Sequence, residues 1–375
     1  MELVLRKADL LRELQLLQGI VERKITIPVL ANVLIEADGG EIRMVATDLE
    51  VGLRSRCEAS VARPGTVTIP AKKLFEIVKN LPETDIRIEE DKGGVKVAAD
   101  RFDSRLTTQA ADEFPAVPMG ADDYPESLPA AGLKQMVKKT HFAITGEDTR
   151  YFLNGGLLVL GRDEMSLVAT DGHRLALVTV PRGGEEKPSK KKAAEEGVRV
   201  ILPKKTLSEL DRLLAEGPDT VLFARGENHL FFKVGERVLI SRVIDGQFPA
   251  FERVIPKSND KHIDFERDKL ASAIRRVSLL SNERSRAVKL QIDPGKVRVT
   301  SSSPEVGEAE ETLMVEYNGP SLQVCFNAQY MLDFLTNVET EQVVLEFKDD
   351  VSQAVMRPVS PEGYEYLYVI MPMRI

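Results

Sequence analysis

The spacing of apolar positions along the chain alternates between a helical and a strand period. Six stretches carry apolar residues every three or four positions, which places those residues on one face of a helix. These stretches are 10–21, 74–81, 133–137, 207–214, 270–277 and 331–335. Pro70 and Pro203 precede two of the predicted helices, and proline is tolerated in a first turn because its missing N–H would have no partner there.

Segments rich in β-branched residues lie between the predicted helices. Residues 29–36 and 42–47 flank Asp38-Gly39-Gly40, which is typical of a hairpin, and 155–160 with 165–168 repeat this arrangement. Further strands are expected at 86–89, 95–98 and 343–347. The pattern predicts an α+β fold whose repeating unit holds two helices and about eight strands.

Three short sequence markers recur in the same order in each third of the chain. The first is the Val-Ala-Thr-Asp segment at 45–49 and 168–172, with a weaker copy at 299–303. The other two markers lie at 69–73, 202–207 and 326–331, and at 114–116, 248–250 and 370–372. A period of about 125 residues is the size of an independently folding domain rather than of a solenoid repeat. We therefore expect three domains, at 1–122, 127–256 and 260–375.

The composition is that of an ordinary globular protein, with 43% hydrophobic and 29% charged residues. Cys57 and Cys325 lie in different repeats, so they suggest no disulfide framework. The sequence contains no apolar run of the ~20 residues that cross a bilayer, and residues 1–6 lack the features of a signal peptide. A cytoplasmic location is expected.

The net charge of −8 by itself disfavours nucleic acid as a partner, because phosphate binding depends on Lys and Arg. However, the predicted helices are basic while the strands and loops carry the acidic residues. The basic helix residues are Lys72, Lys73, Lys79, Lys134, Lys138, Lys139, Arg267, Lys269, Arg275 and Arg276. They could form a basic lining that attracts phosphate, or simply the solvated face of each helix.

Residues 183–197 have mixed charge and no apolar periodicity, which predicts an exposed loop inside the second repeat. The run Lys190-Lys191-Lys192 could suggest a DNA-binding tail, but glutamate pairs flank it. A solvated loop is the favoured interpretation.

Common catalytic motifs for phosphate loops, zinc proteases and serine hydrolases are absent, and the four histidines do not have metal-ligand spacing. The one catalytic-looking segment is 170–174, where Asp171 and His173 could form a general-base dyad. Thr47-Asp48 repeats the acid without the histidine. A strand-end turn, in which the aspartate binds backbone N–H groups, is therefore favoured over an enzyme.

The threefold repeat and four segments together resemble the DNA polymerase III β subunit family, the sliding clamps, along the whole chain. The segments are 150–155, 168–176, Phe248-Pro249 and 368–375. The resemblance implies a non-catalytic accessory subunit with no cofactor or metal: a head-to-tail homodimeric ring of six domains around duplex DNA, with helices inward. Phosphate contacts that do not depend on the DNA sequence would then suffice to hold the DNA, because the closed ring itself keeps the protein on it.

The resemblance also implies site residues. For DNA they are Lys24, Arg150, Tyr151, Phe152, Lys204 and Lys205, to which the charge pattern adds Lys72, Lys73, Lys134 and Lys138. Core packing is the alternative for Tyr151 and Phe152. The dimer contact would place Leu279 and Leu280 against the region of Leu106.

A pocket between the second and third repeats is implied to bind a short linear motif with Gln and a hydrophobic end. Its residues would be Leu153, Thr170, Gly172, His173, Arg174, Leu175, Pro249, Arg253, Val254, Asn327, Tyr330, Val351, Val369, Ile370, Met371, Pro372, Met373 and Arg374. The apolar members would supply burial, while His173 and Arg174 would supply orienting donors. Alternatively, the last strand only completes the third domain.

Implied partners are the replicative polymerase α subunit, the clamp loader δ subunit, translesion and repair polymerases, mismatch-repair proteins and ligase. Two departures from the family pattern bear on this prediction. Ser285 stands where family members can carry a large aromatic, and 301–303 replaces an acidic turn. A protein scaffold that never binds DNA is a third hypothesis.

Overall fold

The structure is a computed structural model that describes residues 1–21, 27–91, 93–183, 197–215 and 217–374. Lys24 and residues 184–196 of the expected loop lie outside the described residues. The chain forms two compact units, one built from 1–134 with 205–243 and the other from 135–204 with 244–375. The division runs through the predicted central domain, because that domain contributes strands to a sheet in each unit.

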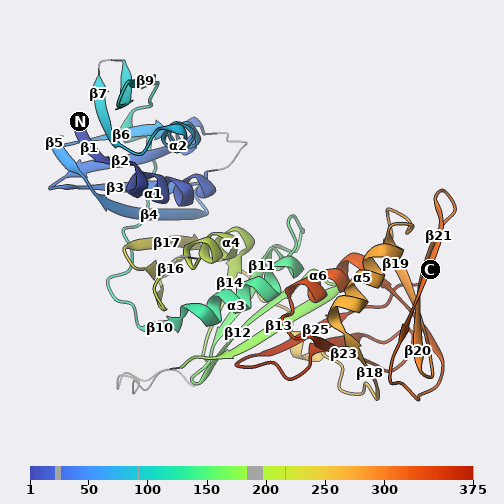
Figure 1. The fold of residues 1–375 in the computed structure, drawn as a ribbon. Helices are drawn as coiled ribbons and strands as arrows, with labels where there is room; N and C mark the ends of the chain where they lie inside the picture. Colours follow the sequence, from blue (N-terminus) through green and yellow to red (C-terminus); the bar gives the residue numbers. More distant parts are fainter. Residues whose placement is uncertain (22–26, 92, 184–196, 216, 375) are drawn as a thin grey trace. The chain divides into compact units, whose positions relative to one another are not determined.

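Within the parts of the chain that the structure describes, each repeat contains two α-helices, as the apolar spacing predicts (Figure 1). They are α1 (Lys7–Ile20), α2 (Ala71–Asn80), α3 (Ala130–Thr140), α4 (Lys204–Leu213), α5 (Arg267–Ser278) and α6 (Ala328–Asn337). Short 3₁₀ helices are η1 (Pro28–Ala31), η2 (Ala111–Glu113), η3 (His141–Ala143), η4 (Tyr151–Leu153) and η5 (Phe251–Arg253). Helix α1 packs beside α2, and α5 packs beside α6.

The first unit contains a five-stranded sheet and an eight-stranded sheet. The five-stranded sheet has the order β5 (Ser60–Arg63), β1 (Glu2–Arg6), β7 (Asp85–Asp91), β8 (Gly94–Ala99), β9 (Phe102–Leu106). The eight-stranded sheet has the order β10 (Glu126–Pro129), β15 (Thr220–Arg225), β16 (His229–Val234), β17 (Arg237–Arg242), β4 (Val51–Glu58), β3 (Glu41–Thr47), β2 (Asn32–Asp38), β6 (Gly65–Pro70). The antiparallel pairing of β17 with β4 joins the second repeat to the first.

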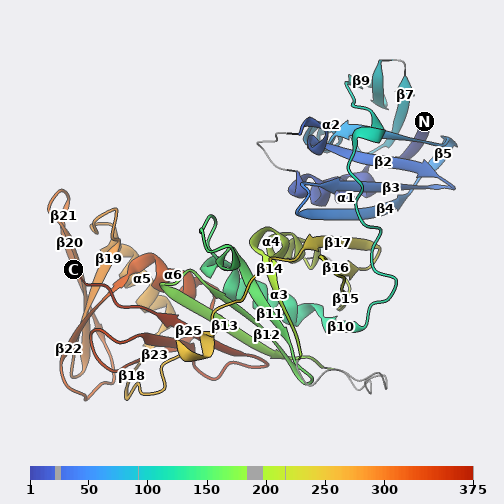
Figure 2. The same cartoon turned by 180° about the vertical axis from the view of Figure 1, so that it is seen from behind.

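The second unit likewise contains an eight-stranded sheet and a smaller sheet, here of four strands (Figure 2). The larger has the order β14 (Val198–Pro203), β11 (Gly155–Leu160), β12 (Glu164–Thr170), β13 (Arg174–Pro181), β25 (Glu365–Ile370), β24 (Ala354–Pro358), β23 (Gln342–Phe347), β18 (Lys261–Glu266). The smaller has the order β21 (Gly307–Met314), β20 (Lys296–Ser303), β19 (Ala287–Asp293), β22 (Leu322–Asn327). Here β13 pairs with β25 and joins the second repeat to the third.

One local prediction needs correction. Residues 29–31 belong to η1 rather than to a strand, since Pro28 fixes a helical first turn before β2 begins at Asn32. The prediction that a helix follows Pro70 and Pro203 is confirmed, because these prolines end strands β6 and β14 and helices α2 and α4 begin at the next residue. The hairpin prediction is confirmed, because Gly39 and Gly40 have φ of 59° and 93° between β2 and β3.

The predicted α+β class is confirmed, with 23% helix and 44% strand. In the second unit, Leu175 and Val369 share a core cluster with Phe248 and Phe251, so strands of the second and third repeats bury one another. None of the helices in the described parts of the chain is long and apolar enough to span a membrane.

Candidate functional site

The Thr-Asp-Gly segment forms the turn between β12 and β13. Asp171 accepts hydrogen bonds at Oδ1 from the backbone N–H groups of His173 (2.9 Å) and Arg174 (3.0 Å). Thr170 Oγ1 donates to the carbonyl oxygen of Arg174 at 2.6 Å, and Gly172 has a φ of 88°. The turn contains Thr and Asp because their short polar side chains can form hydrogen bonds with the backbone of the neighbouring residues. The strand-end turn favoured from the sequence is confirmed.

The first repeat contains the same turn between β3 and β4. Asp48 Oδ1 accepts from the N–H groups of Glu50 (2.9 Å) and Val51 (2.7 Å), and Thr47 Oγ1 donates to the carbonyl of Val51 at 3.0 Å. Leu49 occupies the place of Gly172 with a φ of 79°. The two copies therefore share a backbone conformation, and the main difference is that Val51 stands where the second copy has Arg174.

The geometry does not support a general-base dyad. The second oxygen of Asp171 accepts from Nε of Arg174 at 3.0 Å, and the side chain of His173 is exposed. Among the residues that the structure describes, no hydrogen bond joins the imidazole to this carboxylate. Nor does any group of three or more His, Cys, Asp or Glu residues in those parts have the arrangement of a metal site.

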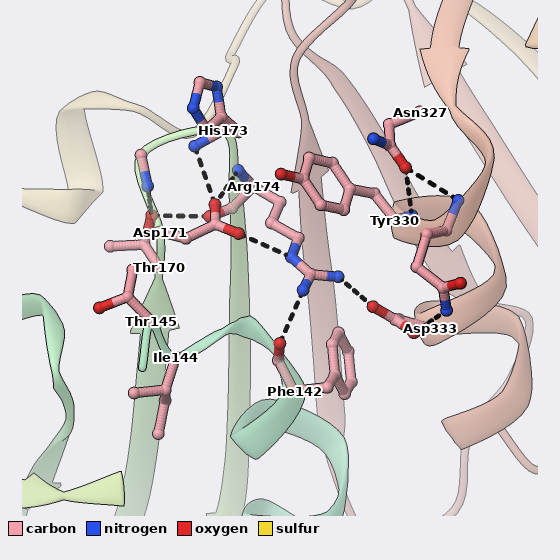
Figure 3. A network of polar contacts seen from close by, with 12 residues as sticks. Phe142, Ile144, Thr145, Thr170, Asp171, His173, Arg174, Asn327, Tyr330 and Asp333 are labelled. Carbon is pink, nitrogen blue, oxygen red and sulfur yellow. Dashed lines mark hydrogen bonds and ion pairs between the residues drawn. The ribbon is translucent and has the colours of Figure 1, made fainter. Parts of the chain in front are cut away.

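Arg174 is the centre of the polar network in the second unit (Figure 3). Its Nη1 donates to Asp333 Oδ2 at 2.5 Å, its Nη2 donates to the carbonyl of Phe142 at 2.7 Å, and its Cζ lies 4.3 Å from the ring centre of Tyr330. Burial on its own would lower the pKa of Arg174, but Tyr368, Asp333 and Asp171 outweigh it and raise that pKa. The guanidinium, 9% exposed, thus binds groups of its own chain, unlike the partner-facing donor expected from the sequence.

The C-terminal segment completes this arrangement. The N–H of Met371 donates to the carbonyl of His173 at 3.0 Å, directly after the β13–β25 pairing ends. The N–H of Met373 donates to the carbonyl of Cys325 at 2.8 Å on β22. The last residues are thereby attached to both the second and the third repeat.

The pocket residues expected from the sequence fall into two groups. Leu153, Leu175, Val369 and Ile370 are at most 2% exposed, so they support the site from the core instead of forming its surface. Exposed apolar surface comes from Val254 (40%), Val351 (57%) and Met371 (40%). Gly172, His173, Arg253 and Arg374 are also exposed, while Thr170 is buried and Pro249, Pro372 and Met373 are half-buried.

Asn327 and Tyr330 are positioned by the start of α6. Asn327 is its N-cap, and its side-chain oxygen accepts from the N–H groups of Gln329 and Tyr330. Its amide nitrogen donates to the carbonyl of Ser285 at 3.3 Å, which places Ser285 beside the site. Burial raises the pKa of Tyr330, and Asp171 adds to this effect.

The segment 150–152 presents very different side chains. Tyr151 is 74% exposed, whereas Phe152 is partly buried against the core cluster of Leu157 and Val369. Arg150 is exposed and donates to both oxygens of Asp148, at 3.0 and 2.8 Å, and these hydrogen bonds lower the pKa of Asp148 to about 2. Core packing therefore accounts for Phe152 but not for Tyr151.

Most of the candidate DNA-binding lysines already have partners in the chain. Lys204 donates to the carbonyl of Ile144 at 2.8 Å, and Lys205 to that of Ile20 at 2.6 Å and to Asp48. Lys73 pairs with Glu76 and Lys138 with Glu339. Lys72 is half-buried and Lys134 is exposed. Lys139 has no exposed side-chain surface, so its expected place in a basic lining is wrong.

The residues expected at a dimer contact lie at sheet edges or near them. Leu279 is 77% exposed just after α5, and Leu280 is half-buried. Leu106 ends β9, an edge strand of the five-stranded sheet, and β21 is an edge strand of the four-stranded sheet. Edge strands present unpaired backbone groups that can pair with another chain.

Sequence reasoning missed Phe142, Asp333 and Tyr368 as members of the Arg174 network. Asp333 lies 159 positions after Arg174 in the chain, and Tyr368 lies 194 positions after it. An aspartate inside a helix and a tyrosine inside a strand carry no local signal of such a contact.

Comparisons with known proteins agree over the full length. Family models of the DNA polymerase III β subunit match in succession: the N-terminal domain at 1–118, the central domain at 127–250 and the C-terminal domain at 252–374. The beta sliding clamps of Pseudomonas aeruginosa and Escherichia coli K12 are 39% and 34% identical, with 100% of each chain covered.

Solved structures agree as well. A sliding clamp from Pseudomonas aeruginosa and one from Bartonella birtlesii, both bound to griselimycin, match with TM-scores of 0.90 and 0.91 at 37% and 34% identity. Each match covers 100% of both chains. The chain therefore belongs to the DNA polymerase III β subunit family, the non-catalytic sliding clamps that serve as processivity factors of the polymerase.

Proposed function

We propose that two copies of this chain close head to tail into a ring that encircles duplex DNA. The observation that carries this proposal is the succession of three clamp domains along the chain. The two smaller sheets also have edge strands, among them β9 in the first and β21 in the second. Pairing of β9 from one copy with β21 of the other would cover these two edges at each contact and close the ring by symmetry.

DNA would be held by topology, with weak help from side chains. The exposed Lys134 and Tyr151 are the best candidates for contact, since Lys204 and Lys205 are engaged by backbone carbonyls and the exposed Arg150 is paired with Asp148. Because each phosphate contact releases counterions, substituting Lys134 by alanine should reduce the slope of log affinity against log salt by about 0.9. The chain would act in the cytoplasm, on nucleoid DNA.

Partner proteins would dock at the site around Arg174 and Tyr330. Clamps from two relatives were solved with griselimycin, and one from Caulobacter crescentus was solved with polyethylene glycol at a putative beta-motif tethering region. In this chain, the exposed Val254, Val351 and Met371 supply apolar surface suited to a short peptide with a hydrophobic end. The replicative polymerase, the clamp loader and repair proteins would compete for it.

The ring proposal is tested with clamp loaded by its clamp loader onto nicked circular DNA. The protein should remain bound during gel filtration in high salt and should be lost when a restriction enzyme linearises the circle. Retention that is unchanged by linearisation would reject encirclement. A scaffold that never binds DNA would fail to co-elute with the circle at all.

A further inference from the structure

Asp333 lies on α6 and connects two segments that belong to different repeats. Its Oδ2 accepts from Arg174 Nη1 at 2.5 Å, and its Oδ1 accepts from Gln329 Nε2 at 2.7 Å (Figure 3). Asp171, the other carboxylate on Arg174, belongs to the same turn as the arginine. It can hold that turn together, whereas Asp333 is the carboxylate, among the residues that the structure describes, whose ion pair ties the turn to the third repeat.

The guanidinium of this ion pair lies over the ring of Tyr330. The Arg174 guanidinium is 4.3 Å from the centre of that ring and 5.3 Å from the ring centre of Phe142. The hydroxyl of Tyr368 donates to the carbonyl of Tyr330 at 2.8 Å, which fixes the backbone on the same side. A planar guanidinium stacked on an aromatic face while paired to a carboxylate has little freedom to move.

We propose that Asp333 is a positioning residue for partner binding. This inference rests on the proposed function and adds a residue to the proposed peptide site. By holding Arg174, it keeps the 170–174 turn and the Tyr330 ring in the arrangement that receives an apolar side chain of a partner peptide. The exposed Met371, whose N–H is bonded to His173 of that turn, is held in the same frame. The site is thus assembled across two repeats before the peptide arrives, which removes an ordering cost from binding.

Loss of the carboxylate should therefore act on affinity more than on folding. When Asp333 becomes asparagine, the ion pair is lost and the assembled arrangement of the site becomes one of several conformations in solution. Apparent affinity falls in proportion to the fraction of molecules in the binding-competent conformation. If that fraction is a tenth, Kd is about tenfold weaker. Part of the loss should be a slower association rate, because the competent state must form first.

The experiment uses the full-length chain and two probes: griselimycin, and a fluorescein-labelled pentapeptide that begins with Gln and ends in Leu-Phe. Kd is measured for the wild type, Asp333→Asn, Arg174→Lys and the double variant. Asn337→Ala is the matched control, since Asn337 lies one turn further along α6 and its amide donates to the backbone carbonyl of Asp333, not to the carboxylate. Dimer mass and thermal midpoint are recorded for every variant.

The expected result is about a tenfold weaker Kd for Asp333→Asn with both probes, unchanged dimer mass, and wild-type binding by Asn337→Ala. In the double variant the two substitutions should be non-additive, because both break the same contact. If Asp333 had a merely structural role, its substitution would lower the thermal midpoint, but the effects of the two substitutions on Kd would not be coupled. Wild-type affinity in Asp333→Asn, or fully additive losses, would overturn the inference. If the wild type binds neither probe, the proposed peptide site itself fails.

Discussion

The ammonium nitrogen of Lys139 lies 3.4 Å from a carboxylate oxygen of Glu339, although the lysine side chain has no exposed surface. Lys139 is at the end of α3 in the second repeat, and Glu339 follows α6 in the third. The ammonium also lies 4.8 Å from the ring centre of Tyr364. The pair therefore joins two repeats within the second unit, at a position where the sequence suggested a free basic helix face.

Replacing Glu339 by glutamine should leave the buried ammonium without its carboxylate. The expected loss at pH 7 is about 1–2 kcal/mol in the free energy of unfolding, less than for a fully buried pair because Glu339 is half exposed. Lys138→Gln removes the exposed partner of the same carboxylate and should cost no more than about 0.5 kcal/mol. Urea unfolding measures both, and equal stability of Glu339→Gln and wild type at pH 7 would contradict the prediction.

The same variant should show a distinct pH dependence. Burial lowers the pKa of Lys139, and Glu339 opposes that shift. Because the unfolded chain then binds this proton more tightly than the folded chain, stability rises with pH between the lowered pKa and the ordinary value of 10.5. Removing Glu339 lowers the folded pKa further, so the deficit of Glu339→Gln should be largest near pH 7. It should narrow as Lys139 loses its proton towards pH 10.

Substitutions at the equivalent positions Gly172 and Leu49 of the two related turns should differ in their effect on stability. Gly172 has a φ of 88°, so Gly172→Ala should cost about 1 kcal/mol through backbone strain. Leu49→Gly, at the equivalent position, should be close to neutral, since relief of strain at φ 79° offsets the about 0.5–1 kcal/mol entropy cost of glycine. Urea midpoints of both variants test this, and a neutral Gly172→Ala would disagree with it.

Adjacent aromatic residues should separate stability from DNA contact. Phe152→Ala removes packing on the core cluster and should lower the free energy of unfolding by about 1–3 kcal/mol. Tyr151→Ala, at a side chain that is 74% exposed, should change stability by no more than about 0.5 kcal/mol and should weaken DNA binding instead. Thermal unfolding together with a DNA mobility assay distinguishes the two, and equal destabilisation would be the opposing result.

The dimer contact is tested by one exposed leucine and one exposed methionine. Leu279→Asp places a charge at the proposed contact and should convert the dimer to a monomer at micromolar concentration. Met119→Asp is the control, because Met119 is 70% exposed but lies in the segment between the first two repeats. Light scattering after gel filtration gives both masses; a Leu279→Asp dimer would argue for another contact.

Both cysteines should be inert in the folded protein. Burial, assisted by Glu13, raises the pKa of Cys57 to about 12, and burial also raises the pKa of Cys325. Since the thiolate is the reactive form, neither should react with Ellman's reagent at pH 8 until guanidinium chloride unfolds the chain. Rapid reaction of one thiol in native protein would show that its surroundings open.

Local signals in the sequence predicted the elements well. The apolar spacing located the six α-helices of the described residues, and Asp38-Gly39-Gly40 correctly indicated a hairpin. The Thr-Asp turn was predictable because a short side chain binding its own backbone involves only neighbouring residues. Pro70 and Pro203 correctly indicated where α2 and α4 begin.

Long-range pairing was not predictable in this way. In the sequence Lys139 looks like any other helix lysine, yet its side chain has no exposed surface and lies beside Glu339 and Tyr364 of the third repeat. The role of Arg174 depends on Asp333, which is 159 positions away, and on two aromatic rings from other elements. Contacts between residues so far apart in the sequence cannot be predicted from the pattern of neighbouring residues.

The threefold repeat and the α+β unit could be predicted from the chain order alone, because duplication and periodicity are properties of that order. The family was indicated by the resemblance of particular segments, such as 168–176 and 368–375. How equivalent residues of the repeats differ in their contacts became clear only from the folded chain. Val51 and Arg174 occupy the same place in matching turns, but the second turn lies against α6 and β25, where a buried guanidinium finds two carboxylates and an aromatic face. The physical reason is that burial and pairing arise when distant strands share a sheet, as β13 and β25 do.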